Sequence, residues 1–233
     1  MRLDKFLCEM KIGTRSQVKT YIRQGLETVN GTTASDAGQK VAETSDRICF
    51  RGQNLQYCRY VYYMLYKPKG VVSATQDNRD KTVVSLLGSC QREDIFPVGR
   101  LDKDTTGLLL LTNDGDLAHQ MLSPKKHVDK TYQVTALYPL REDEKRALEE
   151  GVDIGDAKSA LPARVEVLKG EKFLITIQEG RFHQIKRMLQ AVGNQVMELK
   201  RVSFGGLHLD EELQPGEYRE LTAEEVYAIK SSL

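Results

Sequence analysis

The sequence contains few cysteines and no long hydrophobic run. No apolar stretch approaches the roughly 18 to 20 residues that a helix needs to cross a bilayer. The first seven residues mix charges with a short apolar stretch, so we expect no signal peptide. The four cysteines, Cys8, Cys49, Cys58 and Cys90, form no Cys-x-x-Cys pair, which argues against a disulfide framework and a structural zinc site. We therefore expect a cytoplasmic protein that does not enter the membrane.

Several catalytic signatures are also missing. The chain has no Gly-x-x-x-x-Gly-Lys phosphate loop, no Gly-x-Ser-x-Gly elbow and no His-Glu-x-x-His metal motif. The four histidines, His119, His127, His183 and His208, lie too far apart in the sequence to form a local metal cluster. Any chemistry must then depend on carboxylates, tyrosine and arginine.

The composition itself is that of a globular protein. Of the 233 residues, 40% are hydrophobic and 29% are charged, which suits one large domain or a small domain beside a medium one. The net charge is only +1, but the last 27 residues hold two basic and seven acidic side chains, for a net charge of −5. The preceding residues therefore carry +6, which is compatible with a polyanionic partner.

The N-terminal residues predict two short helices followed by a hairpin. Apolar residues recur at helical spacing over residues 3–10, and a capping-box pattern at residues 14–17 begins a second helix that ends near Gly25. Residues 26–33 predict a strand and an Asn-Gly turn.

A basic stripe lies along the second of these helices. Arg15, Lys19 and Arg23 follow each other at intervals of four residues, which places them on one face. Two interpretations are open: the stripe is an ordinary solvated face, or it belongs to a module that grips RNA.

Beyond an unpatterned stretch at residues 55–61, hairpins alternate with a few helices. We place a boundary here, between a small domain at residues 1–58 and a larger one at residues 59–233. Grouped strands with interposed helices predict an α+β fold whose sheet is mixed, largely antiparallel and flanked by helices. The expected strands are residues 61–66, 71–74, 108–111, 130–137, 163–168 and 173–178, and the expected helices are residues 82–87, 116–122, 142–150 and 183–192.

The densest group of polar side chains is the loop at residues 96–107, which leads into a strand of four leucines. A buried strand fixes such a loop, while the loop presents its side chains. Two interpretations of Asp102 are open at this point: it is a nucleophile or base, or it satisfies backbone groups of the turn.

Motifs spread over nearly the whole chain resemble those of one enzyme family. Residues 99–102 (Gly-Arg-Leu-Asp), followed by residues 105–115, resemble the defining motif of the RsuA-type pseudouridine synthases. Residues 67–70 resemble the family's Lys-Pro-x-Gly element, residues 130–132 its Lys-x-Tyr element, and residues 180–188 its Gly-Arg-x-His-Gln stretch. The first residues are similar to the S4 RNA-binding domain, which implies a small S4-like α/β module, although Glu27 stands where S4 domains usually carry an apolar strand residue.

The resemblance implies an RNA-modifying isomerase that converts uridine into pseudouridine. This reaction breaks the N-glycosidic bond, turns the base and rejoins it through carbon, so the resemblance implies neither a metal nor a redox cofactor. The family's catalytic aspartate falls on Asp102, which would act covalently on the ribose or on the uracil ring. Its arginine falls on Arg181, which would supply the positive charge that keeps Asp102 ionised. Its tyrosine falls on Tyr132, which would pack against the uracil and assist proton removal.

The resemblance also implies contacts to an RNA backbone. The target base must leave its stack, at a cost of a few kcal/mol that phosphate contacts would offset. The expected RNA-binding residues are Arg2, Lys5, Arg15, Lys19, Arg23, Lys67, Arg100, Lys186 and Arg187.

The chain most resembles the subgroup that modifies uridine 516 of 16S ribosomal RNA. We therefore expect a monomer that acts on 16S rRNA, in an assembling small-subunit particle. Two alternatives are a 23S rRNA pseudouridine synthase of the same family and a non-catalytic S4-type ribosome-assembly factor. A glycoside hydrolase that uses Asp102 and Asp104 as paired carboxylates is disfavoured, because residues two apart on an extended chain point to opposite faces.

Overall fold

The computed structural model describes every residue except 11, 44, 56, 58, 91 and 93. The described chain divides into two compact units. The first comprises Met1–Tyr60 together with Gly88–Asp94, and the second comprises Val61–Leu87 together with Ile95–Leu233. The expected boundary between residues 58 and 59 involves a residue outside the described set, so that boundary stays a prediction.

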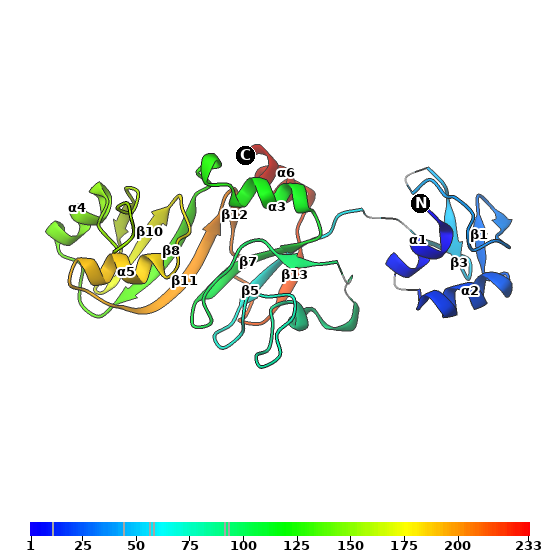
Figure 1. Cartoon of the computed structure of the whole chain (residues 1–233), viewed down its shortest axis with the longest axis horizontal. Helices are drawn as coiled ribbons and strands as arrows, with labels where there is room; N and C mark the ends of the chain where they lie inside the picture. The colour runs from blue at the N-terminus through cyan, green and yellow to red at the C-terminus, as the bar shows by residue number, and fades with distance from the viewer. Residues whose placement is uncertain (11, 44, 56, 58, 91, 93) are drawn as a thin grey trace. The chain divides into compact units, whose positions relative to one another are not determined.

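The N-terminal unit packs two helices on a small antiparallel sheet (Figure 1). The reciprocal hydrogen bonds of Thr14 and Gln17 confirm the predicted capping box. Asn30 and Gly31, at φ 53° and 82°, confirm the predicted tight turn. The helices are α1 (Leu3–Glu9) and α2 (Arg15–Arg23); the strands, in the order β2-β1-β3-β4, are β1 (Glu27–Val29), β2 (Thr32–Thr33), β3 (Ile48–Phe50) and β4 (Gln53–Leu55).

Glu27 is a fully buried acidic residue of this unit. Its side chain lies at the start of β1 and has no exposed surface. Burial raises the pKa of Glu27, because removing a carboxylate from water penalises its charged form. This position therefore lowers the stability of the unit at neutral pH.

We expect Glu27→Met to raise the free energy of unfolding of the N-terminal unit at pH 7 by about 1–2 kcal/mol. The folded pKa lies above the ordinary glutamate value of 4.5, so the folded state binds more protons and stability falls as pH rises from 4.5 through the folded pKa. The variant should lose this slope. Hydrogen exchange of the β1 amides between pH 4 and 8 measures it. Glu166→Met, at an exposed strand position, is the control, and an equal effect of both variants would contradict the prediction.

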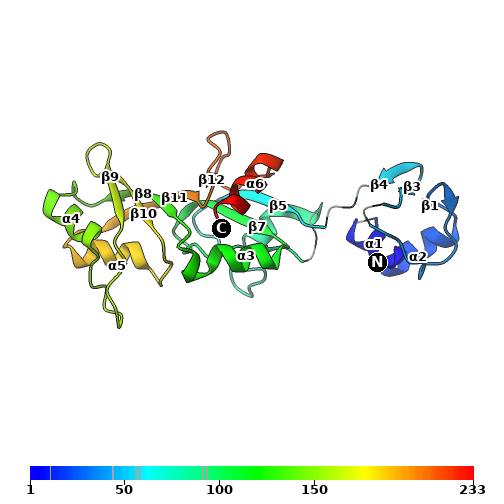
Figure 2. The same ribbon diagram turned by 90° about the horizontal axis from the view of Figure 1, so that it is seen from above.

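The larger unit is built on a nine-stranded mixed sheet (Figures 1 and 2). The strand order is β13-β5-β7-β11-β8-β10-β9, with β6 paired to β7 and β12 paired to β11. Strands β7 and β11 pair in parallel, and the other neighbouring pairs are antiparallel. This confirms the predicted α+β fold with a largely antiparallel mixed sheet.

Most of the predicted elements of this unit are present with shifted ends. The strands are β5 (Tyr62–Lys67), β6 (Phe96–Pro97), β7 (Thr106–Thr112), β8 (Lys130–Ala136), β9 (Arg164–Val167), β10 (Lys172–Ile177), β11 (Val196–Phe204), β12 (Leu207–His208) and β13 (Tyr218–Glu220). The helices are α3 (Gly115–Leu122), α4 (Glu142–Glu150), α5 (Gln184–Ala191) and α6 (Ala223–Ser231), with short 3-10 turns η1 (Val84–Cys90) and η2 (Pro124–Lys126).

Two local predictions are wrong. The strand expected at residues 71–74 is only an isolated bridge from Val72 to Thr82, and the helix expected at residues 82–87 is a 3-10 turn. The acidic C-terminal segment, for which we expected no elements, contributes β12, β13 and α6. Its Arg219 forms ion pairs with Asp210 and Glu225, at 2.6 and 2.8 Å. No helix among the described residues is long and apolar enough to span a membrane.

The leucine strand β7 lies between two cores, which explains its continuous apolar run. Leu109 and Leu111 join the core that includes residues of α4 and α5, whereas Leu108 and Leu110 join the core that includes residues of α3 and α6. Alternate side chains of a strand point to opposite faces, so a strand covered on both faces must be apolar throughout. The loop that carries Asp102 therefore leads into a rigid, fully buried element.

Gly107 permits β7 to begin where it does. Its φ of 103° is in the left-handed region, and a Cβ there would lie 2.2 Å from the carbonyl oxygen of Arg201 on β11. The parallel pairing of β7 with β11 therefore requires glycine at this position.

Candidate active site

The Asp102 loop, residues 98–105, is held by hydrogen bonds from residues far away in the sequence. Ser73 Oγ donates to the Leu101 carbonyl at 2.9 Å and accepts from the Leu101 N–H at 3.0 Å. The Gly70 N–H donates to the Lys103 carbonyl at 2.8 Å. These contacts fix the backbone on both sides of Asp102.

Lys67 lies inside this loop and not on the surface. Its side chain is fully buried, and Nζ donates to the carbonyl oxygens of Pro68, Asp102, Lys103 and Thr105 at 2.9 to 3.4 Å. Burial lowers the pKa of Lys67 to about 8, with the nearby carboxylates opposing the shift, so the ammonium is largely protonated at pH 7. The geometry argues against the predicted contact of Lys67 with RNA phosphates, because its ammonium is buried within the loop and bonded to backbone carbonyls.

The three residues predicted to be catalytic line one cleft. Asp102, Tyr132 and Arg181 border an open hollow. The other lining residues are Arg100, Leu101, Thr105, Ile177, Gly180, His183, Gln184, Ile185, Lys186 and Leu199. Asp102 and Arg181, which are 79 positions apart in the sequence, thus border the same cleft as Tyr132, near the C-terminal end of β10 and the start of α5.

The positive charge nearest to the Asp102 carboxylate comes from Lys186. The Lys186 Nζ lies 3.1 Å from Asp102 Oδ2 and 2.7 Å from Asp104 Oδ1. Burial works against the charged form, but the hydrogen bonds to Asp104 and Asp102 raise the pKa of Lys186. The imidazole Nε2 of His183 is 3.7 Å from the same Asp102 oxygen. From the sequence we expected Lys186 to contact RNA and gave His183 no catalytic role, although both lie in the motif at residues 180–188.

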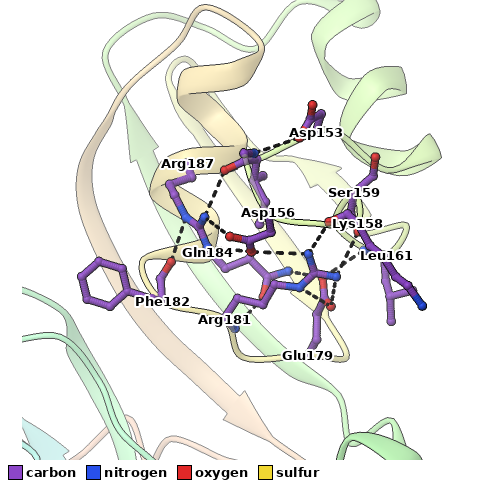
Figure 3. Close-up of polar contacts among 12 residues, drawn as sticks. Asp153, Asp156, Lys158, Ser159, Leu161, Glu179, Arg181, Phe182, Gln184 and Arg187 are labelled. Carbon is purple, nitrogen blue, oxygen red and sulfur yellow. Dashed lines mark hydrogen bonds and ion pairs between the residues drawn. The ribbon is translucent and has the colours of Figure 1, made fainter.

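Arg181 does not flank Asp102 as we expected. Its Nε donates to Glu179 Oε2 at 2.9 Å, and its terminal nitrogens donate to the carbonyl oxygens of Lys158 and Ser159 at 2.6 and 3.0 Å (Figure 3). A further contact reaches Asp156 at 3.5 Å. The Arg181 guanidinium therefore connects the cleft to the loop at residues 152–160. This loop offers it two carbonyl oxygens and the Asp156 carboxylate as hydrogen-bond acceptors.

Tyr132 is paired across the sheet with a buried arginine that the sequence analysis missed. Arg201 is directly opposite Tyr132 in the β8–β11 register and is 2% exposed. Its Nε donates to the Leu108 carbonyl at 2.7 Å. Burial lowers the pKa of Arg201, and the interaction with the Tyr132 hydroxyl opposes that shift. Leu199, Arg201 and Ser203 alternate with a period of two residues, which is typical of a strand and would have placed Arg201 on a buried face. We expected no strand at these residues.

The expected RNA-binding residues differ in their availability. On α2, Arg15, Lys19 and Arg23 are exposed, as are Lys5 and, beside the cleft, Arg100. Apart from the buried Lys67, the others are engaged in ion pairs: Arg2 with Asp4, Lys186 with Asp102 and Asp104, and Arg187 with Asp156. The exposed Lys5 also lies 3.7 Å from Glu9. Among the residues that the structure describes, no group of three His, Cys, Asp or Glu side chains is arranged to hold a metal ion.

Comparisons with known proteins identify both parts of the chain. A family model described as RNA pseudouridylate synthase matches residues 61–191, and one described as S4 domain matches residues 1–48. Ribosomal small subunit pseudouridine synthase A of Escherichia coli (strain K12) is 40% identical over 231 residues, which cover 98% of this chain and 100% of that protein. An uncharacterized RNA pseudouridine synthase of Bacillus subtilis (strain 168) is 44% identical over 234 residues, 98% of either chain.

A solved structure has the same fold over the same extent. A crystal structure of a pseudouridylate synthase matches with a TM-score of 0.70 at 38% identity, and the match covers 98% of this chain and 99% of that one. With a family model spanning more than half of the residues and relatives matching nearly the full length, the chain belongs to the RNA pseudouridylate synthase family and carries an S4 domain at its N-terminal end.

Proposed function

We propose that this protein converts one uridine of 16S ribosomal RNA into pseudouridine, with Asp102 as the covalent nucleophile. The observation that carries the proposal is the single open cleft that Asp102 and Tyr132 share, in which the Lys186 ammonium lies 3.1 Å from the Asp102 carboxylate. A cation at this distance pairs with the carboxylate and orients it. The Asp102 side chain is 32% exposed, so a flipped nucleotide can reach it.

Each residue of the cleft has a role in this proposal. Lys186 supplies the positive charge that we had assigned to Arg181, His183 places its imidazole beside the same carboxylate, and Arg181 instead fixes one wall. Tyr132 packs against the uracil, and its oxygen takes the proton that leaves C5, once the new bond to the ribose has formed, while its own hydroxyl proton passes to water. Arg201, beside the Tyr132 hydroxyl, holds that hydroxyl in place.

The choice of RNA follows from the relatives and from the exposed cations. The relatives named ribosomal small subunit pseudouridine synthase A match this chain over almost their whole length, which supports 16S rRNA as the substrate. The finer proposal, the uridine 516 class, rests on the motif resemblance alone. The exposed cations Arg15, Lys19 and Arg23 of the S4 domain would bind phosphates, as would Lys5, Arg100 and, through exchange of its partner, Arg2. We propose that the protein acts as a monomer in the cytoplasm on an assembling small-subunit particle.

Pseudouridine mapping tests this function directly. The purified protein would be incubated with unmodified 16S rRNA, unmodified 23S rRNA and small-subunit precursor particles, followed by carbodiimide treatment and primer extension. We expect one new stop, in 16S rRNA. A stop in 23S rRNA alone would assign the protein to the large subunit, and binding of all three substrates without any stop would favour a non-catalytic assembly factor.

A further inference from the structure

Phe182 is the most exposed large apolar side chain of the described residues. It is 76% exposed and directly precedes His183, which lines the cleft. The rings of Phe182 and His183 are stacked, with centroids 3.8 Å apart and planes at 18°. His183 in turn lies 3.7 Å from the Asp102 carboxylate. The Phe182 ring is thus exposed to solvent on one side of the His183 ring, and His183 lies between it and the candidate nucleophile.

The backbone holds this ring in place. His183 has a left-handed conformation at φ 49°, which is uncommon for a residue with a side chain and turns the chain at the start of α5. The Phe182 carbonyl accepts a hydrogen bond from Arg187 Nε at 2.9 Å, and the same guanidinium is paired with Asp156. In Figure 3 the Phe182 ring points away from the network formed by Arg181, Arg187 and Asp156. An exposed ring on a fixed backbone loses little conformational freedom when it binds a partner.

We propose that Phe182 is a stacking platform for an unpaired nucleobase next to the uridine that enters the cleft. This proposal rests on the proposed function, and it names the part of the RNA that this residue recognises. A base leaves a stacked helix more easily when its neighbour gains a new stacking partner, and every base has an aromatic face that a phenylalanine can cover.

The chemistry around the ring favours RNA over an apolar partner. The cleft beside it is bordered by the exposed Arg100, whose charge suits a phosphate. The neighbouring Arg181 and Arg187 are polar groups that a hydrophobic protein interface would have to bury. A flat ring beside cations is the combination that single-stranded RNA binds.

The experiment measures RNA affinity separately from catalysis. All proteins would be full-length and carry Asp102→Asn, so that no RNA is converted, and the probe would be a synthetic 16S rRNA fragment centred on the uridine that the wild-type protein modifies. Phe182→Ala is expected to weaken binding by about 5- to 100-fold, and Phe182→Tyr, which keeps the ring, by less than about 3-fold. Tyr227→Ala is the matched control, because Tyr227 is 74% exposed on α6 and does not line the cleft.

An abasic nucleotide identifies the stacked base. When the base on the 5′ or the 3′ side of the target is removed, one of the two fragments should bind weakly to the Phe182 protein, and Phe182→Ala should then add no further loss. Full additivity with both abasic fragments would overturn the proposal, as would unchanged affinity of Phe182→Ala or an effect seen only with ribosomal particles. A fall in kcat of the Asp102-containing Phe182→Ala protein without a change in RNA affinity would also overturn it. Failure of the proposed function has a different signature, since the wild-type protein would then produce no pseudouridine.

Discussion

Replacement of Asp102 by asparagine is expected to abolish pseudouridine formation, with a fall in the single-turnover rate on the order of 10⁴-fold or more. The amide has nearly the shape of the carboxylate but is not a nucleophile. The loop should survive, because its bonds at this position use the Asp102 backbone, which accepts from Lys67 at 3.0 Å and from the Thr105 N–H at 3.1 Å. RNA affinity should be equal or higher, because Lys186 loses one of its two anionic partners and becomes available to a phosphate. Single-turnover conversion and filter binding of the same RNA measure the two effects.

Asp104→Asn is the matched control for this experiment. Asp104 is 69% exposed and lies 2.7 Å from the same Lys186, and this hydrogen bond lowers the pKa of Asp104. Its replacement also removes one charge next to Lys186, but it should reduce the rate by less than about 10-fold, because an exposed ion pair contributes little. Equal losses in the two variants would mean that the charge balance around Lys186 matters and that Asp102 is not the nucleophile.

The sequence predicted the elements whose signals are local. Helix α4 has the predicted bounds at residues 142–150, because its run of charged helix-forming residues and the terminal Gly151 lie within one short segment. The four leucines predicted a buried strand, and the capping box predicted the start of α2. Asp102 and Tyr132 could be predicted as site residues because each lies within a recognisable motif. The folded sheet then places both at one cleft.

The parts that could not be predicted depend on partners distant in the sequence. Arg181 had several possible acceptors, and only the folded position of residues 156–159 decides among them. The acidic C-terminal segment resembled a solvated tail, because α6 fully buries only Ile229 and its charges are balanced by Arg219 on β13. A lysine such as Lys67 is normally exposed, and nothing near it in the sequence shows that a loop 35 residues later surrounds it with carbonyl oxygens.

Replacement of the buried Lys67 by methionine is expected to lower kcat by about 100-fold or more while the affinity for RNA changes little. Lys67 does not line the cleft, so any effect on rate must act through the Asp102 loop. Without the ammonium, the carbonyls of residues 102, 103 and 105 lose their common donor, and the loop relaxes. A displacement of about 1 Å at a reacting group can cost about 100-fold in rate. Steady-state kinetics with the 16S rRNA fragment separate kcat from KM.

The effect on stability should be much smaller than the effect on rate, because two contributions oppose each other. Unsatisfied carbonyls cost about 1–3 kcal/mol, but methionine removes a buried charge whose desolvation already lowers the lysine pKa to about 8. The effect on rate has no opposing contribution, because methionine cannot donate hydrogen bonds that hold the carbonyls of the Asp102 loop in place. Lys69→Met, at an exposed lysine two residues away, should leave kcat unchanged, and Ser73→Ala, which removes both hydrogen bonds to Leu101, should lower kcat by about 10-fold. Weaker RNA binding by Lys67→Met with an unchanged kcat would contradict this prediction. Lys67 would then bind a phosphate, and other contacts would hold the Asp102 loop.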